Sequence, residues 1–277
     1  MHNDSCTPAN DFSVLMAVYA GDDSYLLGIA IDSIYANTLL PAKTILVVDG
    51  PVPILLDQVI QLSVEKYSLE VIRLPENRGL AYALNAGLRF IKTTWVARAD
   101  PDDFNLPGRF KAQITILERG FDLIGAQIIE VDTTGRKIAL RKTPTSADQI
   151  IPFMRHRNPF NHMTVVFRRS FVIEVGGYPN IYLKEDYALW AIMIAHGARV
   201  ANSPDILVRA TTGIGMYARR GGVKYIKSEF KLQRYLANMG CKSILIALLD
   251  GVLRSLIFSL PASLRGKFYE FFLRSRS

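Results

Sequence analysis

The sequence predicts an α/β protein in which a mainly parallel sheet is flanked by helices and followed by basic amphipathic helices. Short apolar runs alternate with amphipathic segments through residues 12–99, and such alternation is typical of right-handed crossovers between parallel strands. The chain has 277 residues, of which 49% are hydrophobic. This is enough for one large α/β domain with a sizeable core and an appendage.

The first third of the chain is the most regular. Strands are expected at 12–19, 43–48, 70–74 and 94–99, and helices at 24–37 and 54–66. A third helix should follow the turn Asn77-Arg78-Gly79, because Leu80, Leu84, Leu88 and Ile91 recur at helical spacing.

The middle of the chain is less regular. Two apolar segments, 123–131 and 137–141, flank Asp132-Thr133-Thr134-Gly135, which is a hairpin signal. A strand is expected at 162–167, a helix at 185–196 that Gly197 closes, and a Gly- and Arg-rich loop at 213–222.

The C-terminal part carries all of the net positive charge. Residues 1–218 hold 21 Lys and Arg against 22 Asp and Glu, a net charge of −1, and residues 219–277 hold 12 against three, a net charge of +9. We therefore divide the chain into a main domain, 1–215, and a basic helical extension, 216–277. Such an extension suits an anionic membrane, a nucleic acid or a phosphate-bearing substrate.

The pattern within this extension favours lipid over nucleic acid. A basic helix is expected from 223 to about 240, followed by an apolar run at 243–260 that contains Asp250 and Arg254. Each charge would cost about 2.5–3.5 kcal/mol at the centre of a bilayer, so a spanning helix is disfavoured. Aromatic and basic residues then mix in 262–277, which suits a helix in the membrane interface. A helical hairpin packed on the main domain is the alternative.

Three carboxylates follow the predicted strand at 94–99, namely Asp100, Asp102 and Asp103. Their repulsion calls for a shared cation, and oxygen ligands favour Mg²⁺ or Mn²⁺. Ligands of open α/β sheets bind beyond the carboxyl ends of strands, which supports this interpretation. A polar turn before a helix is the alternative.

The compartment is inferred from the cysteines and the N-terminus. Cys6 and Cys241 lack metal-site spacing, and the polar start Met1-His2-Asn3-Asp4 has no apolar signal segment. Both features indicate free thiols in a reducing cytosol.

These features together resemble the family 2 glycosyltransferases, inverting enzymes with the GT-A (Rossmann-like nucleotide-diphospho-sugar transferase) fold, over about residues 11–215. The resemblance depends on five motifs in order. They are the first strand Ser13–Tyr19, the strand ending in Asp49, Asn77-Arg78-Gly79 with Leu84-Asn85-Ala86-Gly87, Asp100-Pro101-Asp102-Asp103, and Glu185-Asp186. Residues 158–164 point to bacterial hexosyltransferases of O-antigen or capsule (amylovoran-type) assembly.

The resemblance implies a role for each matching residue. Asp102 would ligate Mn²⁺ or Mg²⁺, and Asp186 would be the catalytic base. The donor nucleotide would contact Ala17, Tyr19, Asp49, Asn77, Gly79, Asn85, Arg98 and Asp100. Two departures stand out: Leu84 replaces the family's frequent Arg, and Asp49 is the only acidic residue before Gly50.

Six further residues are candidates for the acceptor or the diphosphate, each with a structural alternative. Glu185 can be ordinary first-turn helix charge, Asn161 a turn residue, His162 a structural histidine and Trp190 a core residue, which is the favoured interpretation for a Trp there. Arg219 and Arg220 can close over a diphosphate or form a solvated basic face.

The resemblance implies transfer of a hexose from a UDP-sugar to a polyprenyl-diphosphate-linked glycan at the inner face of the cytoplasmic membrane. Galactose is the preferred sugar, and rhamnose from a dTDP donor is an alternative. A nucleotidyltransferase is disfavoured, because Tyr19-Ala20-Gly21-Asp22-Asp23 is acidic where such enzymes have a basic, Gly-rich loop. A nucleic-acid-binding protein is disfavoured because no recognised binding motif occurs.

Overall fold

The structure is a computed structural model that describes residues 11–212 and 221–259. Its strands are β1 (Phe12–Val18), β2 (Lys43–Val48), β3 (Leu69–Arg73), β4 (Trp95–Arg98), β5 (Phe104–Asn105), β6 (Leu123–Val131), β7 (Lys137–Arg141), β8 (Val166–Arg168) and β9 (Val200–Thr211). Its helices are α1 (Ser24–Tyr35), α2 (Ile54–Lys66), α3 (Leu80–Leu88), α4 (Arg109–Leu117), α5 (Ala147–Met154), α6 (Arg169–Glu174), α7 (Glu185–Ala195), α9 (Gly222–Asn238) and α10 (Ile244–Phe258), with a 3₁₀ turn η1 (His162–Thr164).

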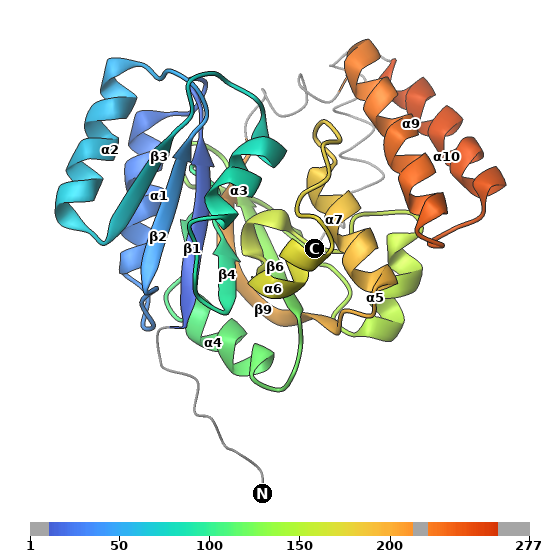
Figure 1. The fold of residues 1–277 in the computed structure, drawn as a ribbon, viewed down its shortest axis with the longest axis horizontal. Helices are drawn as coiled ribbons and strands as arrows, with labels where there is room; N and C mark the ends of the chain where they lie inside the picture. The colour runs from blue at the N-terminus through green and yellow to red at the C-terminus, as the bar shows by residue number, and fades with distance from the viewer. Residues whose placement is uncertain (1–10, 213–220, 260–277) are drawn as a thin grey trace, which may run out of the picture.

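The nine strands of the described ranges form one sheet in the order β3-β2-β1-β4-β8-β6-β9-β5, with β7 paired to β6 (Figure 1). The first four strands in this order are parallel, so their carboxyl ends share one edge. β8 pairs antiparallel with β4 and β6, and β6 runs parallel to β9. The expected α/β sheet is confirmed, with its parallel part in the first third of the chain.

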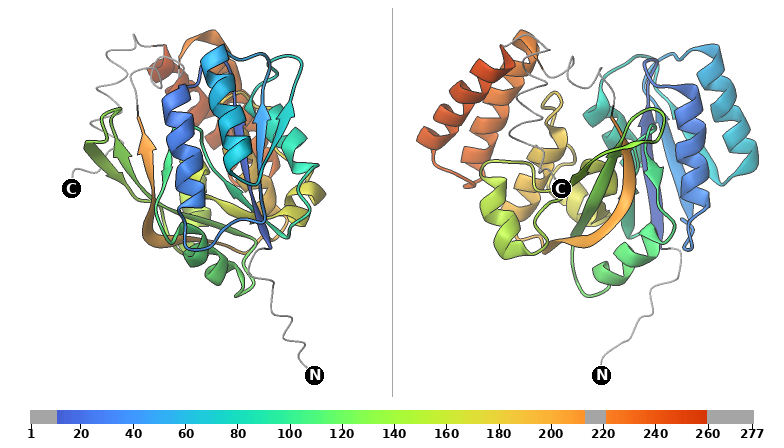
Figure 2. Two further views of the ribbon diagram at one scale, coloured as in Figure 1. Left: turned by 90° about the vertical axis from the view of Figure 1, so that its left-hand side faces the viewer. Right: turned by 180° about the vertical axis from the view of Figure 1, so that it is seen from behind.

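Helices cover both faces of this sheet (Figure 2), and β1 and β2 are therefore buried on both sides. Val14 and Met16 pack with residues of α1, α2 and α4, whereas Leu15 and Ala17 pack with residues of α3, α6 and α7. A Cβ added at Gly87 of α3 would lie 2.5 Å from Leu15 Cδ1. A larger residue at position 87 would therefore have to displace core side chains of β1 and β2 where α3 crosses them.

Five segments differ from the sequence expectation. Residues 162–164 form η1 rather than the start of a strand, because Thr164 Oγ1 donates to the Asn161 carbonyl (2.8 Å) and accepts from Ala126 N (2.9 Å). Such local side-chain bonds compete with strand pairing. The others, β5, β9, α5 and α6, were not expected.

The C-terminal helices form a hairpin that packs on the main domain. Leu232 and Leu236 of α9 join a buried cluster with Tyr187, Ala188 and Ala191 of α7. This is the alternative that the sequence left open, and it holds for 221–259. No helix in the described ranges is long and apolar enough to cross a membrane. The boundary expected near residue 215 falls outside the described residues.

Candidate active site

The parallel strands bring several expected site residues to one edge. Ala17 lies near the end of β1 and Tyr19 just after it, Asp49 follows β2, and Arg98 ends β4 two residues before Asp100. These three strands are neighbours in the sheet. The edge is thus the place where a ligand of an open α/β sheet is expected to bind.

Asp49 holds the turn that precedes α3. Its two carboxylate oxygens accept from the backbone N–H of Arg78 and of Gly79, both at 2.8 Å. Gly50 follows with φ +86°, and a Cβ there would lie 2.6 Å from Asn77 N. The Asn77 side chain is exposed at the tip of this turn. Asp49 therefore fixes Asn77 and Gly79 beside the β2 end, and a contact with a nucleotide base remains a proposal.

A buried arginine lies next to the turn formed by Asp100–Asp103, which is called the carboxylate turn below. Arg98 is fully buried and donates to the Ala99 carbonyl and to Asp100. A second buried arginine, Arg109 of α4, donates to the Arg98 carbonyl at 2.6 Å. Burial lowers the pKa of Arg109 to about 9. Two buried guanidiniums therefore support the turn and offset its negative charge.

Asp103 anchors the turn to β9. One oxygen accepts from Thr211 N at 2.8 Å, and the other is buried without a hydrogen-bond partner in the described chain. Burial, and then the charges of Asp102 and Asp100, raise the pKa of Asp103 well above its ordinary value. Asp102 is half-buried. A cation at this turn would relieve the repulsion, so these oxygens fit a divalent metal.

Protein ligands alone do not complete a metal site here. Among the described residues, no group of three or more His, Cys, Asp or Glu is arranged to hold a metal ion. Asp100 is already paired with Arg98. A metal at Asp102 would therefore need oxygens from a bound ligand.

Tyr178 is a buried residue that is held by Asn85 of α3. Its backbone N–H donates to Asn85 Oδ1 (2.8 Å) and its carbonyl accepts from Asn85 Nδ2 (2.9 Å). Burial raises the pKa of Tyr178, and the charges of Arg98, Asp186, Glu185 and Asp100 act on it as well. Asn85 thus positions Tyr178, and charges from both acidic segments act on this tyrosine.

His162 contacts the same tyrosine. Its Nε2 lies 3.1 Å from the Tyr178 hydroxyl. Burial, and then the charge of Arg98, hold the pKa of His162 well below its usual range. Burial and the charge of Arg98 therefore favour the neutral imidazole at its contact with Tyr178.

Glu185 and Asp186 begin α7, as expected, and both resist ionisation. Burial and then the charge of Asp186 raise the pKa of Glu185 to about 7. Burial also raises the pKa of Asp186, which accepts from Asn158 Nδ2 at 2.6 Å. A carboxylate with a raised pKa is a better proton acceptor, which suits a general base.

Two acceptor candidates lie in the interior. Trp190 is fully buried, with its ring against Phe160 and His162, so it packs in the core and does not present a face to a sugar. Asn161 is 1% exposed, and its Nδ2 donates to the Ala126 carbonyl at 2.8 Å. Both side chains therefore have contacts in the interior of the protein. Arg219 and Arg220 lie outside the described residues.

Three residues of the site, Tyr178, Asn158 and Arg109, could not be selected on functional grounds from the sequence. Asn158 begins the stretch 158–164 that suggested the hexosyltransferase subgroup, and that was its only signal. Tyr178 and Arg109 gave none, because their importance comes from partners far away in the chain.

Two solved structures illustrate the GT-A fold that this chain shares. The S. aureus protein TarS, residues 1–349, in complex with UDP-GlcNAc matches with a TM-score of 0.67 at 17% identity, over 95% of this chain and 76% of that one. The mannosyltransferase PcManGT from Pyrobaculum calidifontis, in complex with GDP-Man and Mn²⁺, matches with a TM-score of 0.62 at 15% identity, over 95% and 81%. The chain thus has the GT-A fold, with acidic residues at the carboxyl edge of its parallel strands.

Sequence comparison specifies the family. The Glycosyl transferase family 2 domain matches residues 13–176, so the chain belongs to glycosyl transferase family 2 and is a glycosyltransferase.

Curated relatives match this chain over nearly its whole length. An uncharacterized glycosyltransferase of Haemophilus influenzae is 41% identical, over 95% of this chain and 99% of the relative. The amylovoran biosynthesis glycosyltransferase AmsE of Erwinia amylovora is 36% identical, over 94% and 98%. The UDP-Gal:alpha-D-GlcNAc-diphosphoundecaprenol beta-1,3-galactosyltransferase of Escherichia coli is 35% identical, over 95% and 96%.

Proposed function

We propose that this glycosyltransferase moves galactose from UDP-galactose to a polyprenyl-diphosphate-linked glycan during bacterial surface-polysaccharide assembly. The observation that carries the proposal is that charges from two acidic segments, Asp100 in the turn after β4 and Glu185 with Asp186 at the start of α7, both act on the buried Tyr178. One segment can hold a donor and the other can activate an acceptor. The named activity of the E. coli relative supports galactose and the lipid-linked acceptor.

Asp186 is proposed as the base that removes the proton of the acceptor hydroxyl. A hydroxyl is a weak nucleophile until it loses its proton, and a positioned carboxylate can take that proton as the new bond forms. Asn158 fixes the Asp186 carboxylate by donating to one of its oxygens. A single displacement at the anomeric carbon would invert its configuration.

The donor diphosphate is proposed to lie at the carboxylate turn with Mn²⁺ or Mg²⁺. Asp102 would ligate the metal, and the diphosphate would supply further oxygens. The metal would act as a Lewis acid on the charge that develops on the leaving diphosphate. The nucleotide would then lie along the ends of β1, β2 and β4, near Ala17, Tyr19, Asp49, Asn77, Gly79, Asn85, Arg98 and Asp100.

The remaining assignments concern the acceptor and the compartment. We place Glu185, Asn161 and His162 around the acceptor as supporting residues. Each of these residues is hydrogen-bonded within the protein. They are therefore proposed to position neighbouring groups of the site and not to contact the acceptor directly. Arg219 and Arg220 are proposed to contact the diphosphate. A lipid-linked acceptor places the enzyme at the cytoplasmic face of the membrane, as a peripheral protein whose C-terminal helices contact an anionic surface.

Calorimetric titration of UDP, with and without Mn²⁺, tests the donor site. We expect metal-dependent binding to the wild-type protein and its loss in Asp102→Ala. Glu118→Ala replaces an exposed residue just after α4. This variant is the matched control and should bind UDP as the wild type does. Binding of dTDP instead of UDP would favour the rhamnosyl donor. Absence of binding to either nucleotide would overturn the proposal.

A further inference from the structure

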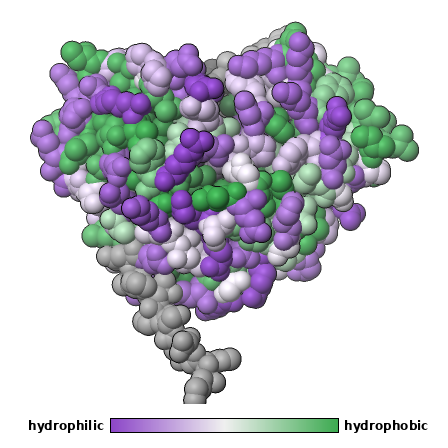
Figure 3. Space-filling view, in the orientation of Figure 1, coloured by the Kyte–Doolittle hydropathy of each residue, from purple (hydrophilic) through white to green (hydrophobic). Residues whose placement is uncertain are grey.

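Helix α10 exposes a continuous apolar surface. The side chains of Leu245, Leu248, Leu249, Val252, Leu253 and Leu256 are each between 50% and 70% exposed. They recur at three- and four-residue spacing, so they form one stripe along the helix. In Figure 3 a hydrophobic area covers the edge of the molecule where Figure 1 places α10. These six residues are called the α10 apolar face below.

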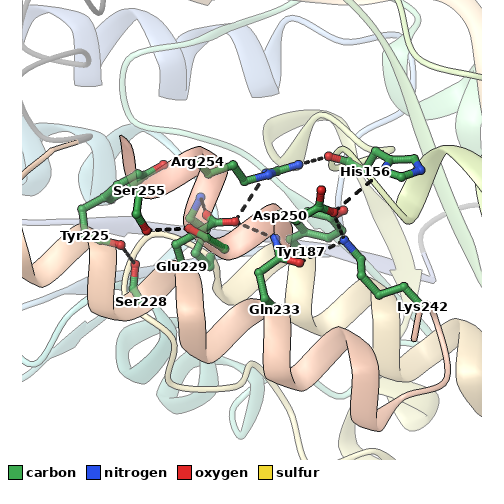
Figure 4. Close-up of polar contacts among 12 residues, drawn as sticks. His156, Tyr187, Tyr225, Ser228, Glu229, Gln233, Lys242, Asp250, Arg254 and Ser255 are labelled. Carbon is green, nitrogen blue, oxygen red and sulfur yellow. Dashed lines mark hydrogen bonds and ion pairs between the residues drawn. The ribbon is translucent and has the colours of Figure 1, made fainter. Parts of the chain in front are cut away.

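The charged side chains of α10 turn in the opposite direction, toward the protein. Asp250 pairs with Lys242 at 2.6 Å, and Arg254 lies 3.5 Å from a carboxylate oxygen of the buried Glu229 (Figure 4). Arg254 also donates to the His156 carbonyl. The inward side of α10 thus holds its two charged residues beside the buried Ala247, Gly251 and Phe258, whereas its outward side is apolar.

A surface of this kind indicates a binding partner. Monomeric soluble proteins rarely expose large contiguous apolar patches, and those that do generally use them for a protein or membrane contact. Burial of α9 against α7 leaves the α10 apolar face outward. The internal ion pairs of Asp250 and Arg254 hold the helix in this orientation.

The neighbouring helix carries a basic stripe. Lys224, Lys227, Lys231 and Arg234 are all exposed on α9 and recur at spacings of three, four and three residues. The acidic residue of α9, Glu229, is fully buried. The hairpin thus carries an exposed apolar stripe on α10 and exposed positive charge on α9, and this combination is complementary to a bilayer of anionic lipids.

The length of α10 determines how it can meet a bilayer. Its 15 residues span about 22 Å at about 1.5 Å per residue, which is less than the roughly 30 Å hydrocarbon core. The helix can therefore lie in the membrane interface, but it is too short to cross the bilayer. Self-association is less suitable, because a second copy would bring another basic stripe close to this one.

We propose that the α10 apolar face inserts in the plane of an anionic bilayer while the basic stripe of α9 contacts lipid headgroups. Membrane docking by α10 rests on the proposed function and extends it. The α10 apolar face would be the surface that brings the enzyme to a lipid-linked acceptor. Since α9 packs on α7, which begins with Glu185 and Asp186, docking would also orient the proposed base relative to the membrane.

Vesicle co-sedimentation of the full chain tests the proposal. We expect binding to vesicles of phosphatidylcholine with phosphatidylglycerol and much weaker binding to phosphatidylcholine alone. The double variant Leu249→Glu with Leu253→Glu should reduce partition by at least about tenfold, because two inserted side chains become charged. Leu55→Glu with Leu62→Glu is the matched control, since these leucines of α2 are 65% and 64% exposed, and it should bind as the wild type does.

Three results would overturn the proposal. They are a wild-type protein that does not bind anionic vesicles, an α10 variant that binds as well as the control, and a wild-type dimer in sedimentation velocity that the α10 variant converts to monomer. Transfer to a water-soluble, short-chain diphosphate acceptor is measured in parallel. If the wild type transfers sugar without binding vesicles, membrane docking is wrong and the proposed function stands. If it binds vesicles but transfers no sugar, the proposed function is wrong and docking stands.

Discussion

Lys184 Nζ lies 2.8 Å from Glu229 Oε2, and this ion pair joins the residue before Glu185 and Asp186 to the C-terminal hairpin. Both side chains are buried. Burial raises the pKa of Glu229, but Lys184 and Arg254 together hold it below its ordinary value. Leu183, the residue before Lys184, has φ +54°, a conformation that non-glycine residues seldom adopt without support. We therefore interpret the hairpin as a brace for the turn that leads into α7.

Glu229→Ala is expected to destabilise the protein by about 3–5 kcal/mol, because Lys184 is left buried without its partner. Chemical denaturation measures this change. Glu70→Ala is the control, since it breaks the exposed pair of Glu70 and Lys43, which should contribute at most about 1 kcal/mol. Equal losses in the two variants would show that the Lys184–Glu229 pair does not brace the structure.

The regular part of the fold could be predicted from the sequence, because its pattern is local. β1, β2, α1 and α2 lie close to their expected bounds. β9 could not be predicted, since Ser203-Pro204-Asp205 in its middle is typical of a turn. The strand accommodates these residues with register shifts against β6. Helix α5 could not be predicted either, because it contains Pro152, and proline is unusual inside a helix.

The site could be predicted where residue type and strand ends suffice, as for Asp100, Asp102 and Asp186. The partners of these residues could not be predicted. Asn85 reaches Tyr178, which lies 93 positions later, and Asp103 reaches Thr211, which lies 108 positions later. Contacts of this kind depend on how the elements pack, and no local pattern in the sequence records them.

Trp190→Ala is expected to cost about 3–5 kcal/mol of stability, because a fully buried indole is removed from contact with Phe160 and His162. Trp190→Phe should cost much less, since the indole N–H has no hydrogen-bond partner among the described residues. Thermal unfolding of both variants checks the order. A Trp190→Phe variant with normal stability but a strongly raised KM for the acceptor would instead support sugar stacking.

Asp186→Asn is expected to reduce transfer by about 10²–10⁴-fold, as the loss of a general base commonly does. UDP binding should stay unchanged, and so should folding, because the amide oxygen can still accept from Asn158. Single-turnover assays and UDP titration measure the two properties separately. Glu174→Gln, at the exposed end of α6, should leave both intact. Near-normal transfer by Asp186→Asn would mean that another group is the base.

The stability of the folded state is expected to fall as the pH rises from about 4.5 to about 7, in part because of Glu185. Its pKa is raised from 4.5 to about 7 in the folded protein, so over this window the folded state holds a proton that the unfolded state releases. The difference of about 2.5 corresponds to about 3 kcal/mol at about 1.36 kcal/mol per pKa unit. Glu185→Gln should therefore gain stability relative to the wild type across this window and keep a constant advantage above it. Urea unfolding at a series of pH values, with Glu174→Gln in parallel, measures the difference. Parallel curves for the wild type and Glu185→Gln from pH 4.5 to 7 would show that Glu185 ionises normally in the folded protein.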